Sequence, residues 1–385
     1  MATMAAATGI TEEQAAFVEA IRDFAARECG TREQRAALTA GGEVRHHDGI
    51  YRQLADLGWV GCALPEEYGG SGGGTMDACL FLEETGRGLL PIHGSVTSLI
   101  VAKAVEKFGT EEQKREIVAG ICGGDVASIA MSEPGAGSDV GALSCRGRRH
   151  DGGYVVNGQK TWISCAHYAQ HILLVCRTDN TESKHAGITM LAVPQGTPGV
   201  EIRQIDTMGG REVNDVYLTD VFIPEERRLG GEGEAWGQLM AGLNFERVVT
   251  AAHILGLGQR AFDDALAYVK EREQFGRPIG SFQVIKHRIA DLATELECCR
   301  LLLHDVARKA DAEPDRVLAR EASMVKVKIT ETAKRVALEG MQMMGGYGYS
   351  TEYDMEHYVR EALVSTIYAG ASEIQRDIIG KTYGL

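Results

Sequence analysis

The sequence lacks an excess of positive charge, and this absence excludes whole classes of partner. Its 385 residues carry 40 Lys and Arg against 54 Asp and Glu, which gives a formal net charge of −14. Nucleic acids and anionic membrane surfaces both require a basic face on the protein that binds them. We therefore expect neither as a main partner, while a local basic patch for a phosphorylated ligand stays open.

Long apolar runs and ordered cysteine spacings are missing too. No window reaches the roughly 18 apolar residues of a membrane-spanning helix. Met1 to Ile10 has neither a basic start nor an apolar run long enough for a signal peptide. Nine cysteines are scattered without metal-binding or redox spacing, and we expect the adjacent Cys298 and Cys299 to pack within a helix. These absences predict a reduced, cytoplasmic protein with no membrane insertion.

Residues 11–124 have the apolar spacing of helices. Phe17, Ile21 and Ala25 recur at four-residue steps, and Thr11 stands where a helix cap would. The glycine-rich stretch 68–75 interrupts this pattern. Because it lacks the lysine of a P-loop, we expect a tight loop there rather than a phosphate cradle.

Between residues 126 and 229 the pattern changes to short runs rich in Val, Ile, Thr and Tyr. Glycine and asparagine pairs at 152–153, 157–158 and 209–210 separate runs such as 172–176, 187–193 and 215–222, as hairpin turns do. The pattern predicts a small antiparallel barrel or sandwich.

After Gly231 the helical period returns, with long helices expected at 235–272, 282–312 and 315–344. Long helices with short connections are typical of an up-and-down bundle. A chain of this length exceeds one core. The sequence therefore predicts a mainly α fold with a β insert. Its expected parts are an N-terminal α-helical domain at 1–125, a middle β domain at 126–232 and a C-terminal four-helix bundle at 233–385.

Two stretches of the predicted β region place glycines where a backbone could approach a flat or charged ligand. They read M-S-E-P-G-A-G-S-D at 131–139 and N-G-Q-K-T-W-I-S at 157–164. The first alone could be an ordinary turn. Three further stretches lie in the helical region: R-E-Q-F-G-R-P-I at 272–279 followed by Phe282 and Gln283, Q-M-M-G-G at 342–346, and Y-A-G-A-S-E-I-Q-R at 368–376.

In this order and spacing, the five stretches resemble the signatures of the acyl-CoA dehydrogenase family, and the resemblance runs from Thr11 to Ile379. It implies FAD as cofactor, an acyl-CoA thioester as substrate and an electron-transfer flavoprotein or similar acceptor. The cofactor contacts that it implies are Met131, Ser132, Gly137, Ser138, Trp162, Ile163, Ser164, Arg272, Gln274, Phe275, Phe282, Gln283, Gln342, Met343, Gly345, Gly346, Ala371 and Glu373.

The resemblance also distributes roles among these positions. Trp162 is expected to pack on the isoalloxazine and Ser164 to hydrogen-bond the flavin near its hydride-accepting nitrogen. Arg272 would meet the pyrophosphate of a neighbouring subunit's FAD, because its planar fork suits two oxygens, and residues 342–346 would meet the adenosine half. Such sharing makes a dimer the smallest competent unit and implies a homotetramer. Ala371 replaces a frequent threonine, which weakens one flavin contact.

Most members of the family have a glutamate base directly after the tyrosine of the last motif, and this chain has Ala369 there. The backbone N–H of Ala369 can still donate to a thioester carbonyl, but the proton needs another acceptor. Glu246 matches the base position of isovaleryl-CoA dehydrogenase-like members. The other substrate contacts that the resemblance implies are Ser138, Asn244, Arg247, Tyr368 and Gly370.

Helical spacing puts Glu246 on one stripe with Leu239 and Leu243, which His253 and Leu257 continue. Desolvation there would raise its pKa towards the range of a useful general base. The alternative is a surface glutamate near the helix end with Arg247 beside it. Glu373 is a remaining candidate for the base, although it matches a cofactor-facing position.

The sequence thus predicts FAD-dependent conversion of an acyl-CoA to its trans-2-enoyl-CoA, as in fatty-acid β-oxidation. Two rivals stay open. One is an acyl-CoA oxidase or flavin monooxygenase on the same scaffold, although such oxidases usually carry an extra C-terminal domain. The other is a non-catalytic FAD-binding subunit, which the missing glutamate would permit. The acyl group is not determined by the sequence, and a short branched chain is a guess.

Overall fold

We describe residues 9–179 and 183–385 of a computed structural model, leaving aside the side chain of Ala241. The prediction of no signal peptide at residues 1–10 therefore falls almost wholly outside the described residues. Contacts divide the chain into two compact units, which we describe separately. The helical unit comprises residues 9–37, 74–90 and 244–385, and the sheet unit comprises residues 38–73 and 91–243.

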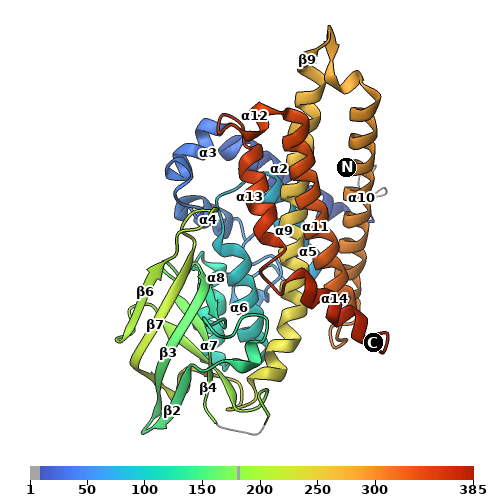
Figure 1. Ribbon diagram of the computed structural model, residues 1–385. Coiled ribbons are helices and arrows are strands. Elements are labelled where there is room, and N and C mark those ends of the chain that lie inside the picture. Colours follow the sequence, from blue (N-terminus) through green and yellow to red (C-terminus); the bar gives the residue numbers. More distant parts are fainter. Residues whose placement is uncertain (1–8, 180–182) are drawn as a thin grey trace. The chain divides into compact units, whose positions relative to one another are not determined.

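The helical unit is built from long helices that run alongside one another (Figure 1). Its helices are α2 (Glu12–Cys29), α3 (Arg32–Leu38), α5 (Thr75–Arg87), α9 (Ala235–Glu271, from residue 244), α10 (Gln283–Ala312), α11 (Ala319–Met344), α12 (Gly346–Tyr349), α13 (Met355–Ser365) and α14 (Ser372–Lys381). The short strands β9 (Glu273–Gln274) and β10 (Arg277–Pro278), with the 3-10 turn η6 (Ile279–Ser281), connect α9 to α10. They form the hairpin at the tip of these two helices.

Two of the three long helices begin and end within one residue of their predicted bounds. The third begins at Ala319 instead of Asp315, because the chain turns after Pro314, with Arg316 N donating to Glu313 O at 3.0 Å. The expected cap at Thr11 is present, since Thr11 Oγ1 accepts from Gln14 N at 3.1 Å and Gln14 Oε1 accepts from Thr11 N at the same distance.

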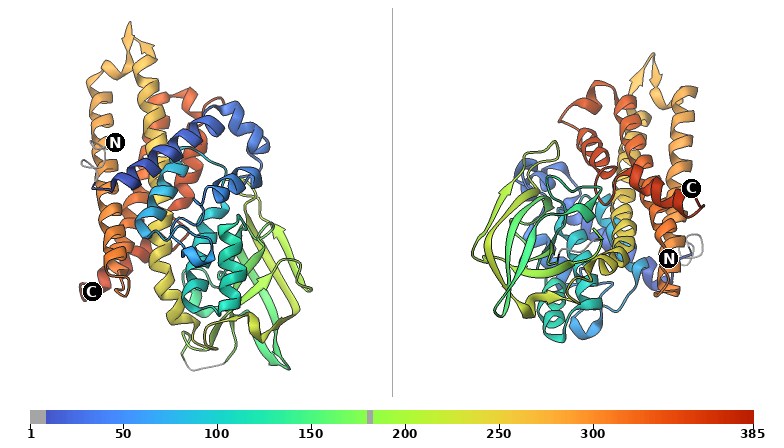
Figure 2. Two further views of the ribbon diagram at one scale, coloured as in Figure 1. Left: turned by 180° about the vertical axis from the view of Figure 1, so that it is seen from behind. Right: turned by 60° about the horizontal axis from the view of Figure 1, so that its bottom comes forward.

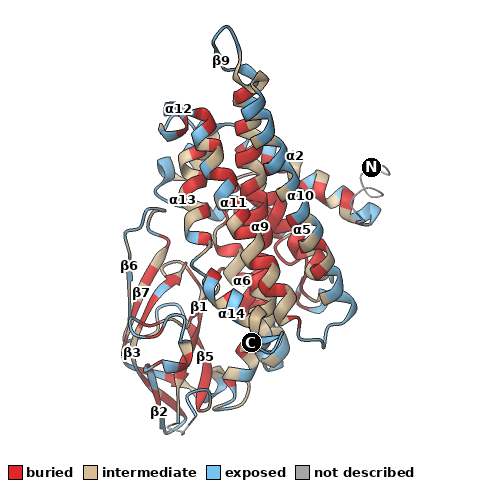
Figure 3. Cartoon of the chain, turned by 45° about the vertical axis from the view of Figure 1, so that its right-hand side comes forward, coloured by how far each residue is buried: buried red, intermediate tan, exposed pale blue. Residues whose placement is uncertain are grey.

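Buried positions recur along α9 and α11 in the interior of the helical unit (Figure 3). The helices approach closely where α9 carries small residues, and a Cβ added at Gly256 would lie 1.9 Å from the Glu83 carbonyl oxygen of α5. Polar groups inside the unit are paired: Glu83 contacts Arg300 at 2.9 Å and His304 at 3.3 Å, and Tyr358 donates to Asp264 at 2.7 Å. Close backbone approach and paired charges therefore fix how α5, α9 and α10 pack.

The sheet unit contains one eight-stranded sheet, which Figure 2 shows from two further directions. Its strands are β1 (Ala127–Ala130), β2 (Arg146–His150), β3 (Gly153–Ser164), β4 (His171–Arg177), β5 (Ile188–Pro194), β6 (Val200–Gln204), β7 (Val213–Pro224) and β8 (Arg228–Leu229). The order is β6-β7-β3-β2-β4-β5-β8, with β1 pairing β4. Pairing is antiparallel except that β4 runs parallel to β1 and β2. Tyr154, Val156, Leu174, Leu191 and Val221 belong to its apolar core.

Short helices complete the sheet unit, and α6 packs against β1. They are η1 (Ala40–Gly42), α4 (Asp48–Asp56), η2 (Glu66–Tyr68), α6 (Gly94–Phe108), α7 (Glu111–Gln113), the π-helical η3 (Lys114–Val118), α8 (Ala119–Cys122), η4 (Val140–Ala142) and η5 (Glu225–Arg227). Residues 69–74 form no helix or strand, in agreement with the predicted loop. The helices before residue 124 thus fall in both units, and the exact three-domain boundaries stay a prediction.

The turns predicted at 152–153 and 209–210 lie where β2 meets β3 and where β6 meets β7. The turn predicted at Asn157 and Gly158 is wrong, because both residues lie inside β3. The pairing of β3 with β7 shifts register between Val156 and Gly158, and Gly158 has a φ of 153°. A bulge in a long strand uses the same residues as a turn, which is why the local pattern was misleading.

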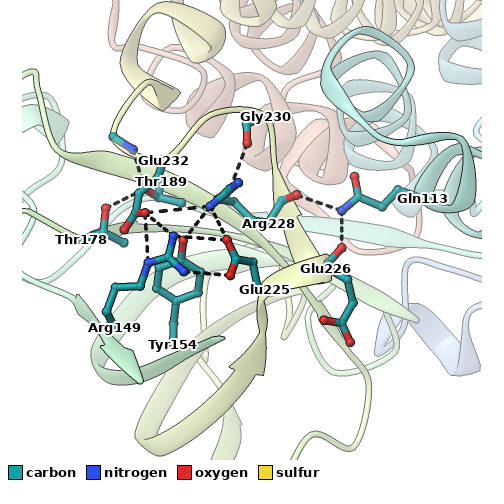
Figure 4. Close-up of polar contacts among 11 residues, drawn as sticks. Gln113, Arg149, Tyr154, Thr178, Thr189, Glu225, Glu226, Arg228, Gly230 and Glu232 are labelled. Atoms are coloured by element: carbon teal, nitrogen blue, oxygen red, sulfur yellow. Dashed lines mark hydrogen bonds and ion pairs between the residues drawn. The ribbon is translucent and has the colours of Figure 1, made fainter. Parts of the chain in front are cut away.

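A network of ion pairs and hydrogen bonds holds the segment that follows β7 (Figure 4). Arg228 donates to the Tyr154 hydroxyl at 3.1 Å and to Glu225 at 3.0 Å, and Arg149 of β2 bridges Glu225 and Glu232. On the neighbouring segment, Gln113 Nε2 donates to the carbonyl of Arg228 at 2.9 Å. These contacts fix the segment that leads from β7 through β8 to α9.

Among the residues described, no helix is both long and apolar enough to cross a bilayer, and no group of three or more His, Cys, Asp or Glu side chains could hold a metal ion. Cys298 and Cys299 are both free thiols in α10, the first exposed and the second buried.

Replacing Gly256 with alanine should test the close approach of α9 and α5. The new methyl group has no room beside the Glu83 carbonyl, so we expect the free energy of unfolding in urea to fall by about 1–3 kcal/mol. Gly242→Ala is the matched control, because a Cβ there meets no described atom within 4 Å apart from its chain neighbours and the nearby backbone of its own helix. It should be neutral or stabilising by up to ~1 kcal/mol. Equal unfolding midpoints for the two variants would contradict this packing.

Candidate active site

The two glycine-containing motifs of the sheet unit lie side by side. Residues 131–139 follow β1, and residues 157–164 belong to β3. Thr161 N donates to Ser132 O at 2.9 Å, and Lys160 Nζ donates to Met131 O at 3.0 Å. Two stretches that are separated in the sequence therefore form one continuous edge.

A buried ion pair stabilises this edge. Lys160 Nζ lies 2.8 Å from Glu133 Oε1, and the two side chains are 0% and 3% exposed. Burial would raise the pKa of Glu133, but Lys160 and the N–H groups of Ser144 and Cys145 outweigh it and hold the pKa below its usual value. Glu133 accepts from Ser144 N at 2.6 Å and from Cys145 N at 2.9 Å. Its carboxylate thus joins the loop after β1 to β3 and to the segment before β2.

Trp162 is presented at this edge by an irregularity in β3. The pairing with β7 shifts register between Lys160 and Ile163, and Trp162 has a left-handed φ of 61°. Its side chain is 60% exposed, which is unusual for an indole in a strand. The flanking backbone is fixed, since Asn214 Nδ2 donates to Ile163 O at 2.8 Å and Ser128 Oγ donates to Ser164 O at 2.5 Å. A bulge that turns a large aromatic outward provides a platform for a flat ring.

The loop after β1 is exposed beyond its first turn. The backbones of Glu133 and Ala136 form two hydrogen bonds with each other, both at 3.0 Å. Gly137 and Ser138, which follow, are both exposed. This loop therefore offers a hydroxyl and free backbone groups next to the Trp162 platform.

In the helical unit, two other motifs line one pocket of about 510 Å³. Predicted cofactor contacts in its wall are Arg272, Gln274, Met343, Gly345 and Gly346. The rest of the wall is formed by Tyr268, Ile279, Met344, Tyr347, Ser350 and Glu352. The Arg272 guanidinium lies 5.6 Å from the centre of the Tyr347 ring. A guanidinium, exposed glycine backbone and aromatic rings together suit a phosphorylated aromatic ligand.

The remaining predicted contacts of this region lie outside the pocket wall. Phe275 is 93% exposed at the hairpin tip with a φ of 54°, and its ring meets that of Phe282 at 6.0 Å. Gln283 and Gln342 are exposed at the start of α10 and near the end of α11. The single chain thus brings together only some of the cofactor contacts that were predicted in the helical unit.

Glu246 lies on α9 and is partly buried. Burial raises the pKa of its carboxyl to about 7, against the opposing charges of Arg247 and Lys326. Among the described residues, none forms a hydrogen bond or ion pair with this carboxyl. Arg247 Nη1 instead donates to Asn244 Oδ1 at 2.8 Å. A desolvated carboxyl without a partner, titrating near neutrality, has the properties of a general base.

The segment with Ala369 forms a left-handed turn between α13 and α14. Ala369 has a φ of 51° and Gly370 a φ of 80°. Lys326 Nζ donates to Gly370 O at 2.8 Å, and Gln375 Nε2 donates to the same oxygen at 2.9 Å. Within residues 9–179 and 183–385, the N–H of Ala369 has no hydrogen-bond acceptor. The turn therefore keeps one backbone donor available for a ligand.

Three other predicted residues surround this turn. Tyr368 precedes it with a side chain at the border of exposure, Ala371 stands before the first residue of α14, and Glu373 is exposed in the first turn of that helix. The exposed position of Glu373 leaves its carboxylate solvated, whereas that of Glu246 is desolvated.

Four supporting residues were missed by the sequence analysis: Glu133, Lys160, Lys326 and Gln375. Lys326 had a readable signal, because a lysine on a helical stripe with Ala322 and Ile329 is an exception to the usual burial pattern. Glu133 and Lys160 stand inside the motifs, but their pairing depends on a contact that spacing does not reveal.

Three family models of known proteins match three successive parts of the chain. The acyl-CoA dehydrogenase N-terminal domain matches residues 11–125, the middle domain residues 128–221 and the C-terminal domain residues 233–384. A mitochondrial isovaleryl-CoA dehydrogenase of Oryza sativa subsp. japonica is 36% identical over 96% of this chain and 90% of its own. A probable acyl-CoA dehydrogenase of Bacillus subtilis is 35% identical over 97% and 98%. The crystal structure of acyl-CoA dehydrogenase from Geobacillus kaustophilus has a TM-score of 0.90 at 31% identity, covering 98% and 99%.

A helical domain, a middle β domain and a helical bundle, with an exposed indole platform, define a flavin-dependent oxidoreductase. The chain belongs to the acyl-CoA dehydrogenase family, and FAD is its cofactor. The residues present fit this cofactor at two places, since the Trp162 edge suits the flat ring system and the Arg272 pocket suits a phosphorylated nucleotide.

Replacing Lys160 with methionine should test the buried ion pair. The Glu133 carboxylate would stay buried without its ammonium partner, so we expect a loss of about 3–5 kcal/mol in the free energy of unfolding. FAD retained after gel filtration should fall as well, because the Met131 carbonyl loses the ammonium that donates to it. Lys184→Met removes an exposed pair with Asp139 and should cost less than ~1 kcal/mol. Equal losses for the two variants would show that the pair does not support this edge.

Proposed function

We propose that the chain oxidises a saturated acyl-CoA thioester to the trans-2-enoyl-CoA. The supporting observation is the desolvated Glu246 carboxyl in a chain whose turn after Tyr368 has alanine where a carboxylate is usual. Removal of an α-proton from a thioester needs a base of this kind, a donor for the enolising carbonyl and a hydride acceptor. FAD supplies the hydride acceptor when it is bound.

Glu246 takes the α-proton in this proposal. Its carboxyl is ionised above pH 7 and forms no hydrogen bond or ion pair with the described residues, so it can accept the proton. The N–H of Ala369 donates to the thioester oxygen, where negative charge grows as the proton leaves. Alanine at this position removes a competing carboxylate and leaves the backbone donor unchanged.

The cofactor and CoA contacts keep the roles that the resemblance implies. Trp162, Ser164 and the loop at Ser132 and Ser138 hold the flavin and part of the acyl-CoA, while Arg247, with Asn244, faces the CoA portion. The Arg272 pocket takes the FAD of a neighbouring copy, with Arg272 at the pyrophosphate and residues 343–346 at the adenosine half. This sharing makes a dimer necessary and a homotetramer the expected assembly. An electron-transfer flavoprotein is the proposed acceptor, and β-oxidation in the cytoplasm is the proposed setting.

A short branched acyl chain is the proposed substrate class. The support is the identity of 36% to a protein named isovaleryl-CoA dehydrogenase, together with a base that matches the position used by such members. A panel of straight and branched thioesters would rank the candidates by kcat/KM.

Anaerobic bleaching of the bound flavin tests the activity itself. We expect at least one thioester to bleach the wild-type protein, and reoxidation to be fast with a dye or flavoprotein and slow with air. Glu246→Gln should stay yellow and folded while kcat falls by about 10²–10⁴-fold. Fast reoxidation by air would favour an oxidase, and a flavin that no thioester bleaches would favour a non-catalytic subunit.

The pH dependence of kcat/KM tests the state of the base. Because the folded pKa of Glu246 is raised to about 7, activity should be full well above pH 7 and fall about tenfold per pH unit below it. The measurement is kcat/KM for the best thioester between pH 5.5 and 9, with the folded state checked at each pH. A profile that stays flat down to the usual range of a solvated glutamate would contradict the assignment.

A further inference from the structure

Two buried side chains from different helices hold the turn at Ala369 and Gly370. Lys326 of α11 donates from Nζ to Gly370 O at 2.8 Å. Gln375 of α14 donates from Nε2 to Gly370 O at 2.9 Å and to Ala369 O at 3.2 Å. Both side chains belong to residues with 0% exposure. The carbonyl groups of Ala369 and Gly370 are therefore fixed inside the helical unit.

These bonds determine the conformation of the turn. Two successive left-handed residues are uncommon, and the first of them is not glycine. Ser372 N donates to Thr366 O at 3.0 Å, which closes the loop around the turn. The Ala369 N–H lies between Tyr368, whose own N–H donates to Val364 O at 3.4 Å, and the two fixed carbonyls.

The ammonium of Lys326 also acts on the base. Burial lowers the pKa of Lys326 to about 8, and the Glu246 carboxylate opposes this shift. By the same interaction, Lys326 lowers the pKa of Glu246. The other charges that face Lys326 are Arg247 of α9, Glu331 of α11 and Glu373 of α14. One buried charge is thus coupled to both the proposed carbonyl donor and the proposed base.

We propose that Lys326 is a positioning residue: together with Gln375 it fixes the Ala369–Gly370 turn, and with it the backbone N–H that donates to the thioester carbonyl. The inference rests on the proposed function, because it presumes that Glu246 and the Ala369 N–H act on a thioester. Gln375 shares this role, but its amide carries no charge, whereas the Lys326 ammonium also acts on the titration of Glu246. A lysine that only filled space would affect folding without affecting the titration of a carboxyl on another helix.

Four variants separate these roles. Lys326→Met removes the bond and the charge, Lys326→Arg keeps the charge with a different reach, and Gln375→Leu removes bonds to the turn without changing any charge. Lys328→Met is the matched control on the same helix, because Lys328 pairs with Glu295 near the surface and, in the part of the chain that the structure describes, donates no hydrogen bond to the turn. Each FAD-loaded protein is measured for kcat, KM and the pH profile of kcat/KM with the best thioester. Amide hydrogen exchange of the peptide that contains residues 368–372 is measured without substrate.

Lys326→Met should lower kcat by about 10- to 100-fold, the range expected for a misplaced catalytic group. In this variant the fall of kcat/KM on the acidic side of the pH profile, the acid limb, should also move to higher pH, because the charge that favours ionised Glu246 is gone. Gln375→Leu should lower kcat with an unmoved acid limb, and Lys326→Arg should keep the wild-type limb. The turn peptide should exchange faster in Lys326→Met and Gln375→Leu, whereas Lys328→Met should match the wild type in every measurement.

Wild-type kcat and an unmoved acid limb in Lys326→Met would overturn the proposal. If that variant does not fold, unchanged kcat in both Lys326→Arg and Gln375→Leu would overturn it instead. Failure of the proposed function gives a different result, in which no thioester bleaches the wild-type flavin. Hydrogen exchange then still decides whether Lys326 and Gln375 hold the turn.

Discussion

The left-handed turn at Ala369 and Gly370 is the constraint on which the proposed chemistry depends. Its two carbonyls accept hydrogen bonds from Lys326 and Gln375, and its first N–H is left free among the described residues. The turn has no side chain that could take a proton. In the proposed reaction the base therefore comes from another element, and α9 offers the desolvated carboxyl of Glu246.

Each unit uses a fully buried lysine to hold a functional loop. In the sheet unit, Lys160 donates to the Met131 carbonyl and pairs with Glu133. In the helical unit, Lys326 donates to the Gly370 carbonyl. Burying an ammonium is costly unless it is compensated, and in both places part of the compensation comes from the backbone of the loop. A loop that helps to satisfy a buried charge has few alternative conformations, which suits a site that must align donors with a reacting group.

Sequence reasoning predicted the long helices well, because apolar residues at helical spacing persist over many turns in α9 and α10. It misread Asn157 and Gly158 as a turn, since a bulge and a hairpin turn require the same permissive backbone. The resemblance named Trp162 as a flavin contact, but spacing did not predict the bulge that turns it outward. Spacing did not predict the Glu133–Lys160 pair either, because both features depend on how β3 registers with its neighbours. Lys326 escaped notice although it interrupts an apolar stripe of α11, because its partner lies 44 residues further along the chain.

The central claim is that α9 supplies the base that the turn lacks. Its most direct test is single-turnover anaerobic bleaching of FAD-loaded Glu246→Gln, alone and combined with Ala369→Glu, with the best thioester at pH 8. The account predicts that the single variant bleaches at least 100-fold more slowly than the wild type and that the double variant recovers part of the rate. Bleaching of Glu246→Gln at the wild-type rate would contradict it.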